Sequence, residues 1–148
     1  MARIVTLPSA SETLEVAVPG GETVDLSVAL DDGAVERMEA FALRESESLD
    51  GLPDEYGAAL RDGDMGRARS VRERIASVMG EALEIACGDG YARLIDALGV
   101  EPADAASSVQ QVFAEVMGMY AERSTELKAK AGHYLAEAKR AQAQPDNA

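Results

Sequence analysis

The chain has 148 residues, with 27 acidic and 14 basic side chains and a formal net charge of −13. This length suits a single domain, and a field of this sign repels nucleic-acid phosphates and anionic lipid headgroups. The composition therefore argues against a protein that contacts nucleic acid directly, and the 4% share of aromatic residues predicts an aliphatic core.

The N-terminal part of the chain carries the clearest local pattern, that of a β-hairpin. Apolar and polar residues alternate in "ETLEVAV" and again in "TVDLSVAL", and the turn sequence Pro19–Gly21 separates the two runs. A period of two is typical of strands that bury one face, and a Gly-Gly turn between two such runs favours antiparallel pairing. Residues 3–7, "RIVTL", are a candidate third strand, because a lone hairpin is marginal in water.

The middle of the chain changes to the apolar period of helices. A first helix is expected from Asp32, and a second from about Asp64 to Cys87. Between them, residues 50–66 contain four glycines and one proline, which predicts a loop with at most a short helix over 54–61. A third, short helix is expected in "YARLIDALG", where the final glycine favours a left-handed C-cap.

The last predicted helix runs from about Ala103 to Gln142, directly after Pro102. About 38 helical residues would span roughly 57 Å, whereas a compact domain of this length has a diameter of roughly 40 Å. The helix is therefore expected to bend, near Gly118 or Gly132, or to project from the domain, unless its end folds back.

Apolar side chains continue along this whole segment. Three in the first half are expected to pack the domain: Phe113, Met117 and Tyr120. Three in the second half form a stripe without a core of its own: Leu127, Tyr134 and Leu135. Because an exposed apolar stripe marks an interaction site, we expect these three residues to contact a partner or a second copy of the chain.

The sequence contains no motif for metal, nucleophilic or phosphate chemistry. His133 is the only histidine and Cys87 the only cysteine, so neither a Cys/His zinc site nor an intrachain disulfide can form. Residues 62–73 match a calcium loop at three acidic positions, but Arg67 stands where that loop needs glycine. The glycine pairs lack the sequences of phosphate-binding loops. We therefore expect no catalytic, cofactor or metal site.

The order of these parts resembles the small tail assembly chaperones of long-tailed phages and prophages of Gram-positive bacteria. An N-terminal hairpin is followed by an acidic first helix, the middle helix "VRERIASVMGEALEIACGDG", the short "YARLIDALGVEP" segment and the helix "SSVQQVFAEVMGMYAERS". The last two pieces are most similar to the family. The glycine-rich stretch over 50–66 and the Arg-Lys-Ala end are not distinctive of it.

The resemblance implies a non-enzymatic protein that shields the long, helical tape-measure protein before tail-tube subunits polymerise around it. It also implies self-association and a bacterial, cytoplasmic setting, and a longer, frameshifted form is common in the group. No apolar run reaches the length of a membrane span.

The expected architecture is one α+β domain over residues 1–142, mainly helical. A β-rich part (3–30) packs on about four helices (32–142), and a disordered tail follows (143–148). Two other functions remain open. The net charge of −8 over residues 31–65 would suit an acidic DNA mimic that inhibits a nucleic-acid enzyme, and a structural adaptor within the virion is the third possibility.

Overall fold

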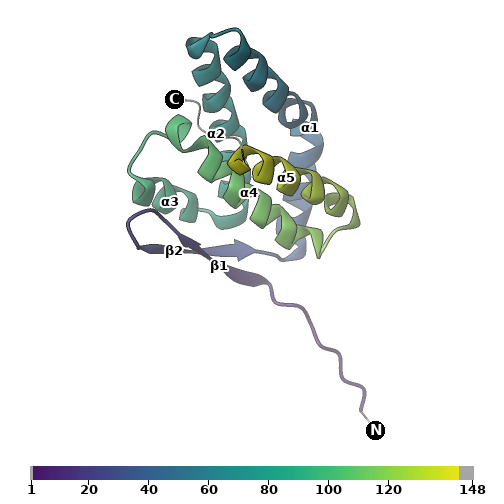
Figure 1. Ribbon diagram of the computed structural model, residues 1–148. Coiled ribbons are helices and arrows are strands. Elements are labelled where there is room, and N and C mark those ends of the chain that lie inside the picture. Colours follow the sequence, from purple (N-terminus) through teal and green to yellow (C-terminus); the bar gives the residue numbers. More distant parts are fainter. Residues whose placement is uncertain (1, 144–148) are drawn as a thin grey trace.

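The structure is a computed structural model that describes residues 2–143, with side chains described except at 125, 126, 129–131 and 141–143. Two antiparallel strands lie along one side of a helical body, which confirms an α+β, mainly helical fold (Figure 1). The elements are β1 (Ser11–Ala17), β2 (Thr23–Ala29), α1 (Asp32–Arg61), α2 (Met65–Cys87), α3 (Gly90–Leu98), the 3-10 helix η1 (Pro102–Ala105), α4 (Ala106–Ala121) and α5 (Thr125–Ala143).

The hairpin forms where the alternating pattern predicted it. Its register pairs Leu14 with Leu26, and the turn places Gly20 and Gly21 at φ values of 103° and 93°, which side chains other than glycine rarely adopt. The even-numbered residues of β2 face the helices, and Leu26 and Val28 are fully buried there. The hairpin is thus stabilised by packing on the helical body rather than by further strands.

The predicted third strand is wrong. Residues 2–9 have no regular secondary structure, and they lead away from the helical body (Figure 1). Ile4, Val5 and Leu7 remain 90%, 78% and 79% exposed. The strand propensity of this segment is not used within its own domain.

The glycine-rich loop predicted over residues 50–66 is also wrong for most of its length. Helix α1 continues through Gly51, Pro53 and Gly57 to Arg61, and a short turn over 62–64 connects it to α2. Leu52 and Ala59 of this segment are buried in the core, as is Leu49 just before it. Tertiary packing against α2 outweighs the low helix propensity of glycine and proline here.

The starts and ends of the middle helices agree with the sequence signals. The Asp64 side chain caps α2 by accepting a hydrogen bond from the backbone N–H of Arg67 at 3.0 Å. Gly99 ends α3 in the left-handed conformation, with φ of 69°. Both helices border the hairpin, so they position its inner face.

The core lies between the inner face of the hairpin, α1, α2 and α4. The ring of Phe41 on α1 meets the ring of Phe113 on α4 edge-on, with centroids 6.5 Å apart. The three residues expected to pack the domain are each 0% exposed: Phe113, Met117 and Tyr120. That part of the prediction for the last helix is confirmed.

The last helix is not continuous. Helix α4 ends at Ala121, and after residues 122–124 α5 folds back and packs along α4. The break occurs at neither Gly118 nor Gly132. It occurs where Ser124 begins a new helix, its hydroxyl accepting a hydrogen bond from the N–H of Leu127 at 3.3 Å. The tail predicted over 143–148 lies, apart from Ala143 at the end of α5, outside the described residues.

Candidate functional site

The three residues predicted to contact a partner have different environments. Leu127 is 1% exposed and Tyr134 is 6% exposed, whereas Leu135 is 37% exposed. The fold-back of α5 buries the first two against their own chain, so they are unavailable to a partner while α5 is docked. For Leu127 and Tyr134 the predicted projecting stripe is wrong, and only Leu135 keeps a surface for contact.

The surface that α5 covers is an apolar groove formed by α1, α2 and α4. The Tyr134 ring lies in this groove, with its centroid 5.1 Å from that of Phe113. Leu127 and Ala138 are the other described apolar side chains that α5 buries. A small cavity of about 20 Å³ remains where the four helices meet. Its walls are Leu49, Leu52, Pro53, Ile75, Met79, Gln110, Phe113, His133, Tyr134 and Glu137.

The phenol of Tyr134 is held in its neutral form. Burial raises its pKa to about 12, and the nearby carboxylate of Asp50 adds to the increase. Asp50 also lies 3.8 Å from Nε2 of His133, which is the residue before Tyr134. The ring therefore acts as an uncharged anchor of α5 rather than as an acid or a base.

The turn between α4 and α5 is attached to the hairpin. Arg123 donates a hydrogen bond to the backbone carbonyl of Leu30 at 3.5 Å, and its guanidinium lies 3.8 Å from the carboxylate of Glu12. One turn earlier, the Tyr120 hydroxyl donates to the Ala29 carbonyl. The position at which α5 begins is thus fixed by contacts made just before the turn and within it.

A second, open cleft of about 570 Å³ lies between α2, α3 and η1. Four of its lining residues are carboxylates: Glu73, Glu81, Glu84 and Glu101. Arg69 at its edge pairs with Asp104 at 2.8 Å and with Glu73 at 3.6 Å. Pockets for small molecules are mostly apolar with a few convergent polar groups, so this cleft has the character of a solvated acidic face.

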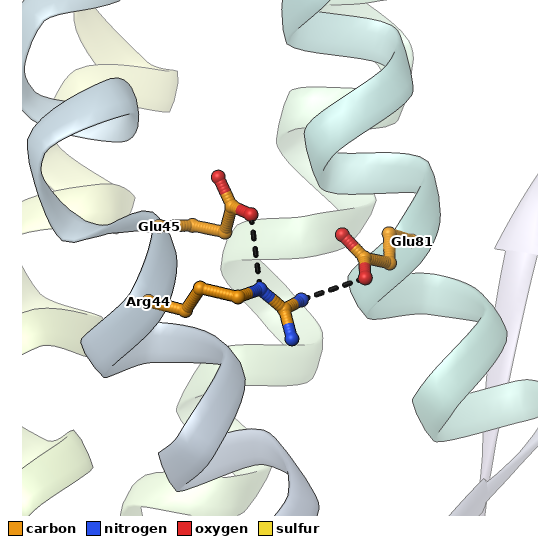
Figure 2. Close-up of polar contacts among 3 residues, drawn as sticks. All are labelled: Arg44, Glu45 and Glu81. Atoms are coloured by element: carbon orange, nitrogen blue, oxygen red, sulfur yellow. Dashed lines mark hydrogen bonds and ion pairs between the residues drawn. The ribbon is translucent and has the colours of Figure 1, made fainter.

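Some acidic residues of the segment 31–65 form ion pairs with arginines. Figure 2 shows Arg44 of α1 between Glu45 of the same helix, at 3.1 Å, and Glu81 of α2, at 2.6 Å. Arg74 of α2 reaches Glu55 of α1 at 2.5 Å. These pairs connect α1 to α2 along the rim of the acidic face.

The residues that could carry chemistry are separate from one another. Burial raises the pKa of the Cys87 thiol to about 11, so the reactive thiolate is disfavoured near neutral pH. His133 is on α5 and Cys87 is on α2, so the two lie on different elements. Over residues 2–143, no three metal-ligating side chains form a group that could hold an ion. None of the described helices combines the length and apolar character needed to cross a membrane.

Comparisons with known proteins found no relative: no family model, curated protein or solved structure matches this chain. Function must therefore be inferred from the sequence pattern and the geometry described above.

Sequence reasoning kept the fold-back of the last helix only as an alternative and missed the groove that it fills, although signals for both are present. The run Ser124–Thr125–Glu126 is a common helix start, with an N-cap serine followed by an acid in the first turn. Leu49 and Leu52 form one wall of the groove, and Leu52 lies in the stretch that the glycines and the proline favoured as a loop. The periodicity of α1 continues through that stretch.

Proposed function

We propose that this protein is a phage tail assembly chaperone, a non-enzymatic protein that binds the helical tape-measure protein and shields its apolar surface during tail assembly. The observation that carries the proposal is the packing of α5 in the apolar groove of its own domain. The apolar groove on α1, α2 and α4 holds an Ala-rich helix through a few anchors, chiefly Leu127 and Tyr134. A groove that holds one such helix is chemically suited to hold another.

The mechanism that follows is helix exchange. In the free protein α5 covers the groove and keeps it from water. For α5 to leave, the turn at residues 122–124 must open and the packing of α5 on α4 must be broken, whereas its contact with α1 is small. A client helix with large apolar residues at similar spacing would then replace α5. Met79 and Ile75 in the groove wall give the site aliphatic side chains, and methionine adapts to different partners.

The negative charge supports the role in a second way. The acidic face between α2, α3 and η1 lies outside the apolar groove, and the net charge of −13 keeps the protein away from nucleic acid. The proposed role uses neither a cofactor nor a metal ion.

The test is binding to the tape-measure protein encoded in the same phage or prophage. The full chain should co-purify with helical segments of that protein. Leu127→Ala weakens the packing of α5 in the groove, so this variant should bind the segments more tightly. Leu135→Ala is the matched control and should bind like the wild type. Absence of binding by all three proteins would contradict the proposal. Recovery of the protein from purified virions would favour the structural adaptor instead.

A further inference from the structure

The outer edge of β1 is an unpaired strand edge. Hydrogen bonds pair Leu30 with Ala10 and Val18 with Glu22, so even-numbered residues of β1 direct their backbone groups towards β2. The odd-numbered residues therefore direct their N–H and C=O groups outwards: Ser11, Thr13, Glu15 and Ala17. Over residues 2–143, no hydrogen bond from another segment reaches these groups.

The opposite edge of the sheet is different. On β2 the carbonyl of Asp25 accepts a hydrogen bond from the Arg93 side chain at 3.3 Å, and that of Ala29 accepts one from Tyr120. Side chains of α3 and α4 thus engage two outward carbonyls of β2. Exposed strand edges are available for pairing with another chain, and over residues 2–143 no helix side chain donates a hydrogen bond to the outward edge of β1.

We propose that the N-terminal arm, residues 3–7, of a second copy of this chain pairs with the outer edge of β1, and that the exchange is reciprocal across a two-fold axis. The arm is rich in strand-forming residues, and three of its side chains are almost fully exposed. It leaves the domain next to the start of β1 (Figure 1). The two extended segments would form a continuous antiparallel pair centred on Ser9, inside a four-stranded sheet.

The charged side chains of the two extended segments favour this register. Centring on Ser9 places Arg3 of one copy opposite Glu15 of the other. Within one chain Glu15 faces Asp25 across a pair that shares no backbone hydrogen bonds, where opposite side chains come closest. Two like charges in this position repel each other, and an arginine beside Glu15 would compensate for that repulsion.

The apolar residues and the proline fit the same register. Ile4 would lie opposite Leu14 on the face that packs on the helices, where Leu14 and Val16 are only half-buried. Pro8 is even-numbered, so its missing N–H falls at a position that needs no hydrogen bond to the second copy. Val5, an odd-numbered residue, would exchange backbone hydrogen bonds with Thr13.

The test compares two single proline substitutions in the full chain. Light scattering measures the mass of each variant, and the monomer mass is 15.6 kDa. The wild type should form a dimer. Val5→Pro removes an N–H that the second copy needs, and it should raise the dimer dissociation constant by about tenfold or more. Thr6→Pro, one residue along, removes an N–H directed away from the second copy and should leave the dimer intact. All these side chains lie outside the core, so the fold should persist by circular dichroism.

A charge exchange tests the register independently. Arg3→Glu and Glu15→Arg should each weaken the dimer, and the double variant should restore it. The proposal is overturned if the wild type is monomeric at high concentration, if Val5→Pro and Thr6→Pro act alike, or if the charge exchange gives no rescue. A dimer lost in Leu135→Asp but kept in Val5→Pro would place the contact on α5 instead.

Discussion

The Tyr120 hydroxyl at the end of α4 donates a hydrogen bond to the backbone carbonyl of Ala29 at the end of β2, at 2.5 Å. The contact joins the last residues of the hairpin to the point where the chain turns into α5. Tyr120 is 0% exposed, so its hydroxyl has no water as an alternative partner in the folded state. We expect Tyr120→Phe to lower the free energy of unfolding by about 1–2 kcal/mol, measured by urea titration. Tyr56→Phe, on half-buried α1 surface, is the control, and an equal loss in both variants would contradict this role.

The packing of α5 gives a second prediction. Leu127→Ala should cost about 2–4 kcal/mol if α5 unfolds together with the body, because a fully buried leucine leaves a cavity. If α5 opens on its own, the global loss is smaller and the amides of α5 exchange faster with solvent. Leu135→Ala, at a side chain that is 37% exposed, should change neither quantity appreciably. Equal effects at the two positions would show that α5 does not dock through Leu127.

Stability should fall at alkaline pH. The pKa of Cys87 is raised to about 11, and those of Tyr120 and Tyr134 to about 12, in each case mainly by burial. The unfolded chain therefore releases these protons first, above its pKa of 9.0 for cysteine and 10.0 for tyrosine. Stability is fully present below those values and is lost as pH rises through the folded ones.

Urea midpoints at about pH 8 and about pH 11 should show this decrease, and Tyr134→Phe should make it less steep between the unfolded and folded pKa values of tyrosine. A slope that Tyr134→Phe leaves unchanged would mean that the phenol of Tyr134 is as accessible in the folded state as in the unfolded one.

Two helical glycines should respond oppositely to alanine. A Cβ at Gly80 would lie 2.6 Å from the hydroxyl oxygen and 2.8 Å from Cζ of Tyr91, so Gly80→Ala must displace the ring that packs α3 on α2. A Cβ at Gly118 in α4 meets nothing within 4 Å. Gly118→Ala should stabilise the protein by about 0.5–1 kcal/mol, while Gly80→Ala should destabilise it. Thermal unfolding measures both, and stabilisation by Gly80→Ala would contradict the close approach of Tyr91.

The ion pair between Arg44 and Glu81 should matter little for stability. Both side chains are about half exposed, and water and salt screen such pairs (Figure 2). We expect Glu81→Gln to leave the urea midpoint unchanged within error. A clear decrease that disappears at high salt would show that the pair holds α1 against α2.

The sequence predicted most of the fold because local signals and tertiary packing agree in most of the chain. The Gly-Gly turn, the cap at Asp64 and the left-handed glycine at position 99 each specify one backbone conformation. Pro53 and the neighbouring glycines misled the prediction because α1 gains more from burying Leu52 than it loses in helix propensity. That balance depends on α2, which local sequence does not reveal.

The residues of the candidate site could be predicted from the sequence, but the surface that they contact could not. The apolar stripe that contains Leu127 and Tyr134 was recognised, but its surface was assigned to a partner because the break at Ser124 was not expected. Helix-forming residues on both sides of the turn conceal it, and contacts of Arg123 with Leu30 and Glu12 help to fix it. Those contacts join positions more than 90 residues apart in sequence, which periodicity cannot show.

Hydrogen exchange of α5 with and without saturating segments of the tape-measure protein tests the proposed helix exchange most directly. If the client replaces α5, amides of α5 should exchange faster when the client is bound, while those of α4 facing the groove should become more protected. Binding that leaves the exchange of α5 unchanged, or slows it, would contradict the claim that the client takes the place of α5.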